Sequence, residues 1–233
     1  MNMNRIMAIA EKDFKEFMRN AMLLTMPLIP ILLAAFYTRL PFDEMPGGKM
    51  MIAVLVVGMA LGMVITSSMM TMLAEENEKH TLRGLINSPA SMLDILLGKS
   101  LVVTIMTFIS ILIALIILQI NIFTNFYMVI GFFELYLFFL LLGIGVGLMV
   151  KSVSETSLYL FPILVIFVMS PLVSSMGFDQ KNIFIKIVDY LPVKQYMNLA
   201  ENSEWMPILV LFIWVLVAFL FVSFLFRKAS LDQ

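Results

Sequence analysis

The sequence predicts an all-α integral membrane protein. Its expected parts are six transmembrane helices, an N-terminal amphipathic interfacial helix, a helix in the largest cytoplasmic loop, and short outer-face helices before the sixth span. Of the 233 residues, 61% are hydrophobic and only 13% are charged, which is more apolar surface than a soluble domain of this length can bury. The apolar residues also gather into long uncharged runs. Residues 1–233 are therefore expected to form one transmembrane domain.

Composition excludes several classes of function. The sequence has no cysteine, so neither a disulfide nor a thiolate metal site can form. His80 is the single histidine, so a histidine metal cluster or a histidine-based triad cannot be assembled within the chain. The formal net charge of −1 argues against a nucleic-acid partner. We therefore expect no cofactor in this chain.

Residues 1–20 are predicted to form an amphipathic helix on the membrane surface. Its apolar face is expected to consist of Ile6, Ala10, Phe14 and Phe17. These residues recur at the spacing of one helix face, and the charged residues lie mostly elsewhere. Such a helix lies along the membrane interface. Two roles fit it equally well, a simple anchor and a docking surface for a cytoplasmic partner.

The six-span bundle is expected over residues 21–226. Its apolar runs are Ala21–Tyr37, Met50–Leu73, Leu101–Ile120, Phe126–Val150, Ser157–Ser174 and Met206–Phe226. A helix needs roughly 20 residues to cross a hydrocarbon core of ~30 Å, with a lower limit near 17. The first run is at that limit and contains Pro27 and Pro30. A kink is expected there, with the freed carbonyl groups bonded by neighbouring helices.

An even number of spans puts both termini on one side of the membrane, and the distribution of positive charge indicates which side. On the side of the termini lie Arg5, Lys12, Lys15, Arg19, Lys79, Arg83, Lys99, Lys151, Arg227 and Lys228. On the other side lie Arg39, Lys49, Lys181, Lys186 and Lys194. Ten residues against five favour cytoplasmic termini, because cytoplasmic loops carry the excess of lysine and arginine.

The largest predicted cytoplasmic loop, residues 74–99, has the pattern of a short surface helix. Acidic residues precede basic residues by three to five positions, a spacing that favours ion pairs along a helix. The acidic residues are Glu75, Glu76 and Glu78, and the basic ones are Lys79, His80 and Arg83. Another face carries Leu82, Leu85 and Ile86, and Ser88-Pro89 ends the helix.

The same loop ends in Gly98-Lys99-Ser100, which are the last three residues of a phosphate-binding loop. The complete motif begins with a glycine where this chain has Leu93, and it follows a buried strand rather than a helix. Lys99 is interpreted instead as a positive anchor at the point where the third span enters the membrane. ATP hydrolysis is therefore not expected in this chain.

Residues 175–205, on the predicted outer side, are expected to form one or two short helices that dip into the outer leaflet. The residues of their apolar face are Ile183, Phe184, Ile187, Val188 and Leu191. Pro192 interrupts this face. The segment fits an interfacial lid, and part of a substrate exit is the alternative.

Glu134 places a carboxyl group inside the fourth predicted span, about two turns from its outer end. Intramembrane acids usually face the interior of the bundle or a wet cavity. Two roles are open: a contact with cargo or a proton, or a structural hydrogen bond to the first or third span.

Taken together, these motifs resemble the permease subunit of type-2 ABC transporters. The resemblance is carried by Glu75-Glu76, Thr81-Leu82, Leu85, Ser88-Pro89 and Leu96-Leu97-Gly98-Lys99. His80 stands where family members usually carry a glycine. The amphipathic N-terminal helix, the six spans and Leu191-Pro192 before the sixth span agree with the family along almost the whole chain.

The resemblance implies a separate ABC ATPase subunit, present in two copies, that binds ATP and Mg. Residues 74–99 would be the coupling helix that contacts this ATPase, and residues 1–20, with Phe14 and Phe17, would be the connecting helix. The coupling residues would be Glu75, Glu76, Lys79, His80, Thr81, Leu82, Arg83, Leu85, Ser88 and Pro89.

The resemblance also implies a second permease, identical or paralogous, and a multi-pass location in the lipid of a bacterial plasma membrane. Compact permeases of this kind expel amphipathic peptides. An interface rich in Met and Phe, of which this chain has 22 and 20, would suit a hydrophobic or amphipathic cargo such as an antimicrobial or toxin-like peptide or a drug.

The alternative is an ATP-independent membrane protein, either a secondary transporter or an immunity or sensor protein. A secondary transporter would show paired intramembrane ionisable residues and broken helices in two matching halves. Glu134 is the one intramembrane acid of this sequence, and no internal repeat is clear. An adjacent gene for a soluble protein with a complete phosphate loop would favour the ABC transporter.

Overall fold

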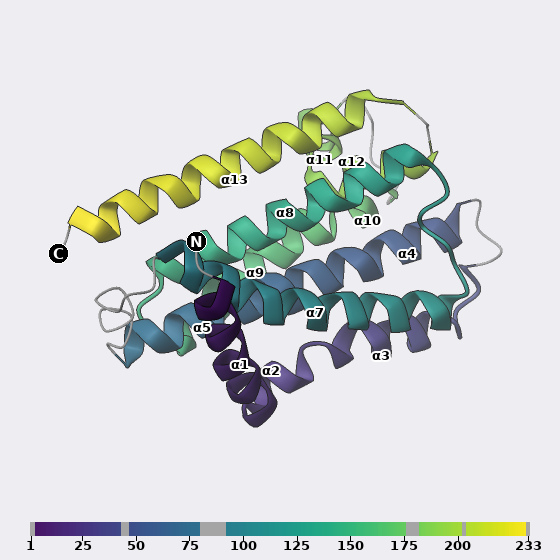
Figure 1. Ribbon diagram of the computed structural model, residues 1–233. Helices are drawn as coiled ribbons and strands as arrows, with labels where there is room; N and C mark the ends of the chain where they lie inside the picture. The colour runs from purple at the N-terminus through teal and green to yellow at the C-terminus, as the bar shows by residue number, and fades with distance from the viewer. Residues whose placement is uncertain (1–2, 43–46, 80–91, 176–181, 202–203, 232–233) are drawn as a thin grey trace.

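The computed structural model describes residues 3–42, 47–79, 92–175, 182–201 and 204–231, and every regular element within these residues is a helix (Figure 1). The predicted all-α class is thereby confirmed. Most of the long helices run side by side, and the N-terminal helix lies across them (Figure 1).

Helix α1 (Met3–Arg19) is the amphipathic helix that the sequence predicts, and its axis is bent by 83° from the segment Ala21–Tyr37. Its buried residues are Ile6, Ala10, Asp13 and Phe17. Three of the four residues predicted for the inner face are therefore buried. The fourth, Phe14, is 44% exposed, and the charged Asp13 is buried in its place.

The predicted kink in the first apolar run is present. Helix α2 (Ala21–Thr25) is separated by Met26 and Pro27 from α3 (Leu28–Tyr37). The carbonyl oxygen of Pro27 accepts a hydrogen bond of 2.7 Å from Oγ of Ser110. A neighbouring helix thus bonds a carbonyl at the break, as membrane helices require where the helix is interrupted.

A continuous helix at the centre of the bundle is formed by α4 (Gly48–Met59), the π-helical segment η2 (Ala60–Thr66) and α5 (Ser67–Glu78). In its most apolar stretch 83% of the residues are buried. Oγ1 of Thr66, in the wider π turn, donates a hydrogen bond of 2.9 Å to the carbonyl oxygen of Phe139 on α8. π-helical segments inside α-helices are frequent at functional sites.

Three more long helices surround the central one: α7 (Met92–Leu118), α8 (Phe126–Met149) and α13 (Met206–Leu231). Their most apolar stretches are 33%, 56% and 17% buried. The broad apolar faces that α7 and α13 expose are those that meet lipid or another subunit in a membrane protein.

The remaining helices are short. They are α9 (Val153–Ile163), the π-helical segment η3 (Leu164–Val168), α10 (Ser170–Ser175), α11 (Ile183–Asp189) and α12 (Pro192–Glu201). Where one or two short helices are expected before the last span, the structure has two, α11 and α12. Pro192 occupies the first position of α12, where its missing N–H costs nothing.

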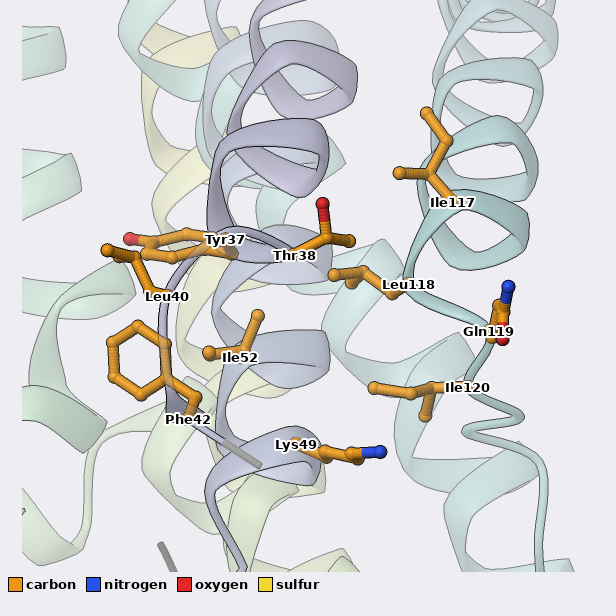
Figure 2. Close-up of a pocket in the computed structure, with 10 residues that line it drawn as sticks. All are labelled: Tyr37, Thr38, Leu40, Phe42, Lys49, Ile52, Ile117, Leu118, Gln119 and Ile120. Atoms are coloured by element: carbon orange, nitrogen blue, oxygen red, sulfur yellow. The ribbon is translucent and has the colours of Figure 1, made fainter. Parts of the chain in front are cut away.

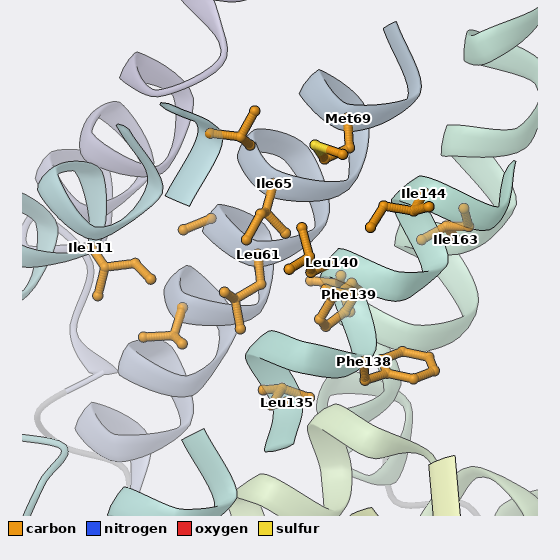
Figure 3. Close-up of a cluster of buried hydrophobic side chains, with 14 of the residues drawn as sticks. Leu61, Ile65, Met69, Ile111, Leu135, Phe138, Phe139, Leu140, Ile144 and Ile163 are labelled. Carbon is orange, nitrogen blue, oxygen red and sulfur yellow. The ribbon is translucent and has the colours of Figure 1, made fainter. Parts of the chain in front are cut away.

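The core is formed where the central helix packs against α8. Leu61, Ile65 and Met69 face α8 residues that include Leu135, Phe139, Leu140 and Ile144 (Figure 3). A Cβ atom on Gly143 would lie 2.9 Å from both Cα and the carbonyl oxygen of Thr66. The two helices therefore touch backbone to backbone, as small residues allow in membrane bundles.

Among the described residues, four helices are long and apolar enough to cross a membrane: Gly48–Glu78, Leu93–Leu118, Phe126–Met149 and Met206–Phe226. The bent pair of Met3–Arg19 and Ala21–Tyr37 makes a fifth candidate if it forms one span, and the apolar helix Val153–Val168 is shorter. These helices support a multi-pass membrane protein. The count of six spans stays a prediction.

The bundle has a proximal end and a distal end. The proximal end is where α5, α8 and α13 finish and α7 begins, and the distal end is where α3 finishes and α4 begins (Figure 1).

Candidate functional site

The last four residues of α5 connect the proximal ends of most other elements, and we call Glu75, Glu76, Asn77 and Glu78 the proximal hub. Oε1 of Glu75 accepts a hydrogen bond of 2.8 Å from Nδ2 of Asn20, between α1 and α2. Oε2 of Glu78 accepts one of 2.9 Å from the backbone N–H of Val153, at the start of α9. Four consecutive residues cover a full turn of helix, so their side chains reach neighbours on every side.

Asn77 adds the connection to α8. Its Nδ2 donates to the carbonyl oxygens of Gly147 at 3.3 Å and Val150 at 2.9 Å. The last carbonyl groups of a helix have no partner within the helix. Asn77 therefore caps the end of α8 and ties it to α5.

Glu76 belongs to a buried cluster of charges that joins three helices. Nζ of Lys99, on α7, lies 2.7 Å from Oε1 of Glu76 and 3.3 Å from Oδ2 of Asp13 on α1. Nζ of Lys12 lies 3.7 Å from Oε1 of Glu76 and 3.9 Å from Oδ1 of Asp13. The cluster thus balances two carboxylates with two ammonium groups.

These charged side chains require partners because they are buried. Lys99 is 1% exposed, Asp13 0% and Glu76 5%. Moving one such charge out of water costs several kcal/mol unless a partner and hydrogen bonds compensate it. Burial raises the pKa of Asp13, because desolvation of its carboxylate outweighs the attraction of Lys99 and Lys12.

Gly98 allows α1 to come close enough for these ion pairs. A Cβ atom at this position would lie 2.8 Å from Cγ2 of Ile9 and 3.0 Å from the carbonyl oxygen of Ile6. Any larger residue would collide with the backbone of α1. Within the Leu-Leu-Gly-Lys motif, the glycine therefore provides contact between α1 and α7, and the lysine provides the ion pair.

The structure changes the interpretation of Lys99. The sequence suggests an anchor in contact with water or lipid head groups, whereas the side chain is buried between two carboxylates. The missed signal is Asp13, which lies three residues after Ala10 and four before Phe17 and so shares their helix face. Gly98, Lys99 and Ser100 lie inside helix α7 rather than in a loop.

The predicted coupling residues divide into two groups. Glu75 and Glu76 belong to the proximal hub, and Nζ of Lys79 lies 3.7 Å from Oε2 of Glu75. His80, Thr81, Leu82, Arg83, Leu85, Ser88 and Pro89 lie outside the described residues. For the predicted connecting helix, Phe17 is fully buried and Phe14 is exposed.

The distal end contains a cavity of about 440 Å³ between α3, α4 and α7 (Figure 2). Its lining residues are Tyr37, Thr38, Leu40, Phe42, Lys49, Ile52, Ile117, Leu118, Gln119 and Ile120. None of these is an acid, a histidine or a cysteine, so the lining offers no carboxylate, imidazole or thiol group. Within the described part of the chain, no cluster of three or more His, Cys, Asp or Glu residues could hold a metal ion.

Glu134 lies on α8 in the distal half of the bundle and is partly buried. Its Oε2 atom is buried without a hydrogen-bond partner among the described residues. The hydroxyl group of Tyr196 on α12 is in the same situation. The structural hydrogen bond considered for Glu134 is thus not made by this oxygen within the described part of the chain.

The fold and the site are those of a membrane protein, with helices long and apolar enough to cross a bilayer and a polar hub at one end. Comparison with protein families matches residues 37–227 to the ABC-2 family of transporter proteins. Since this match covers well over half of the sequence, the chain belongs to the ABC-2 family and is a permease component of an ABC transporter. The matched region is a membrane domain and not a nucleotide-binding domain. Comparison with curated proteins finds no significant relative.

Proposed function

We propose that this protein is the membrane subunit of an exporter that is driven by a separate ATPase. The observation that carries the proposal is the ion pair between Glu76 and Lys99, which joins the two helix ends that flank residues 80–91. Members of the ABC-2 family generally work with an ATPase subunit. Residues 80–91 are the natural contact for that subunit, because they connect the ends that the proximal hub holds together.

In this proposal the proximal end is cytoplasmic, and residues 80–91 are the centre of the coupling helix. Nucleotide-driven closure of the ATPase would move this segment and, with it, the ends of α5 and α7. Lys99 and Asp13 connect the movement to α1, Asn77 connects it to α8, and Glu78 connects it to α9. A ligand shifts an equilibrium only through contacts that differ between two states. A shift of α5 would change the contacts that the proximal hub makes with several other helices at the same time.

The complex would contain two ATPase subunits and a second permease, identical or paralogous, in a bacterial plasma membrane. The exposed apolar faces of α7 and α13 provide the surface that a second subunit and lipid would cover. The cargo would be hydrophobic or amphipathic, such as an antimicrobial or toxin-like peptide or a drug. Adaptable Met and Phe side chains suit such molecules.

The test replaces Leu82 and Leu85 together by aspartate in the complex that is purified with its ATPase. Burial of a leucine contributes about 1.5–3 kcal/mol. A loss of ~3 kcal/mol already weakens binding more than a hundredfold. The double variant should insert into the membrane but lose the ATPase during purification.

A matched control replaces Ile183 and Ile187 by aspartate, since both are exposed apolar residues on α11, away from the proximal end. The control should retain the ATPase. If the Leu82/Leu85 variant also keeps the ATPase and its cargo-stimulated hydrolysis, residues 80–91 are not the coupling element.

A further inference from the structure

A stripe of α8 faces α13, and Glu134 lies within it. A Cβ atom on Gly131 would come within 3.4 Å of Leu211, and one on Gly145 would come within 2.6 Å of Phe221. The rings of Phe138 and Trp214 lie 5.7 Å apart between centroids. Glu134 comes three residues after Gly131 and four before Phe138, so it shares their helix face. Glu134 therefore lies on the face of α8 that packs against α12 and α13.

Within the described part of the chain, a second polar group without a hydrogen-bond partner belongs to a residue that packs against Gly131, three residues before Glu134. Tyr196 of α12 is 0% exposed, and its ring packs 3.3 Å from the position of a Cβ atom on Gly131. Its hydroxyl group and Oε2 of Glu134 are both buried without a hydrogen-bond partner among the described residues. Buried polar groups nearly always have a partner, and an intramembrane acid is a candidate functional site by default.

An aromatic cluster lies one turn further along α8. Phe138 is 5.2 Å from Phe167 and 5.7 Å from Trp214, and Phe167 is 5.6 Å from Trp214, between ring centroids. Phe138 points away from Leu61 on the central helix (Figure 3). Aromatic faces attract cations, and the attraction is stronger where water is excluded. A carboxyl group beside such a cluster suits an organic cation better than an anion or a neutral molecule.

A cavity of about 540 Å³ lies between α11, α12 and the start of α13. Its lining residues are Lys186, Asp189, Tyr190, Gln195, Asn198, Glu204, Met206, Pro207 and Val210. Val210 directly precedes Leu211, which packs against Gly131 one turn from Glu134. The lining carries two acids and one lysine, and this charge favours a cation.

We propose that Glu134, Tyr196 and the aromatic cluster of Phe138, Phe167 and Trp214 form a binding site for an organic cation, a monovalent ammonium or phosphonium group on an amphipathic molecule. In this proposal the cavity lined by Asp189 and Glu204 is the entrance to the site from the distal end. The inference rests on the proposed export function and specifies the charge of its cargo.

The test measures binding to the purified protein in detergent, with two probes of nearly equal size and opposite charge, tetraphenylphosphonium and tetraphenylborate. The chain has two tryptophans, so a Trp205→Phe background leaves Trp214 of the aromatic cluster as the sole tryptophan reporter. Tetraphenylphosphonium should quench Trp214 fluorescence with saturation. Glu134→Gln should raise its Kd about tenfold or more, a loss of roughly 1.4 kcal/mol, whereas Glu134→Asp should retain most of the affinity.

Glu155→Gln is the matched control, because Glu155 lies in the first turn of α9 at the proximal end. The Glu155→Gln variant should bind the cation with the affinity of the parent protein. The proposal is overturned if Glu134→Gln binds tetraphenylphosphonium as tightly as the parent, or if the parent binds tetraphenylborate equally well. Elution as a single folded species in size-exclusion chromatography shows that a loss of binding is not a loss of structure.

The same variant separates this inference from the proposed function. Glu134→Gln should still purify with the ATPase but should lose the stimulation of ATP hydrolysis by the cation. If the parent protein purifies without an ATPase but binds the cation through Glu134, the proposed ATPase-driven function is wrong and the proposed cation site is supported. If the ATPase is present and the cation does not bind, the site fails and the function stands.

Discussion

The ammonium nitrogen of Lys99 lies 2.7 Å from Oε1 of Glu76, and this buried contact joins the last turn of α5 to the second turn of α7. The same nitrogen lies 3.3 Å from Oδ2 of Asp13 on α1. One lysine thus holds three elements together at the proximal end.

Replacing Lys99 by methionine should destabilise the protein strongly. Met preserves most of the side-chain volume but leaves Asp13 and Glu76 buried, and Lys12 is the remaining cation of their cluster among the described residues. Breaking a buried ion pair by removing one partner typically costs about 3–5 kcal/mol. The measurement is the thermal unfolding midpoint of the purified variant in detergent.

The control for this variant is Lys15→Met. Lys15 also forms an ion pair, at 2.7 Å from Glu11, but both side chains are exposed, and exposed pairs contribute little. Its midpoint should equal that of the parent. An unchanged midpoint for Lys99→Met would show that the buried cluster does not stabilise the proximal end.

Replacing Gly98 by valine should displace α1 from α7. The first added carbon alone would lie 3.0 Å from the carbonyl oxygen of Ile6, and a backbone atom cannot turn aside as a side chain can. Trypsin should then cleave faster after Lys12, Lys15 and Arg19, because release exposes the backbone of α1. Leu97→Val, at a neighbouring exposed position, is the control and should be cleaved like the parent. Equal cleavage of both variants would contradict the close contact.

Two variants of Asn20 should separate its two roles. Its Oδ1 accepts hydrogen bonds from the backbone N–H groups of Met22 and Leu23, and its Nδ2 donates to Glu75. Asn20→Ala removes the cap and the donor, and loss of an N-cap costs about 0.5–2 kcal/mol. Asn20→Asp keeps the cap but places a carboxylate beside Glu75.

We therefore expect Asn20→Ala to lower the unfolding midpoint, and Asn20→Asp to reduce cargo-stimulated ATP hydrolysis in the assembled complex. Aspartate caps α2 as well as asparagine does, so this variant changes only the link to Glu75. If Asn20→Asp shows the same stimulated hydrolysis as the parent, the link to Glu75 is not used in coupling.

The topology can be tested without removing any native thiol, because the chain has no cysteine. Single cysteines at Asn4, Asp43, Asn182 and Asp232 are treated in intact cells with a thiol reagent that does not cross membranes. With six spans and cytoplasmic termini, only the variants at Asp43 and Asn182 should react. Reaction at Asn4 and Asp232 alone would reverse the orientation.

The class of the fold was determined by the sequence alone. Long uncharged runs have no stable alternative to helices in a bilayer, because each backbone N–H and C=O group must be bonded within the segment. For the same reason the kink at Pro27 and the amphipathic character of α1 could be predicted locally. Both depend on residues a few positions apart. The resemblance to a transporter permease also came from a contiguous motif, and the family match confirms it.

The partners of the charged residues were decided by the tertiary structure. Asp13 and Lys99 are 86 positions apart, and nothing in either segment indicates which helix would cover the other. Either Phe14 or Asp13 can face the interior on this turn of α1. Hydrophobicity alone predicts that Phe14 is the buried residue. The approach of α1 to Gly98 places the carboxylate of Asp13 at an ammonium group instead. Its pairing with Lys99 and Lys12 then offsets part of the cost of burying this charge.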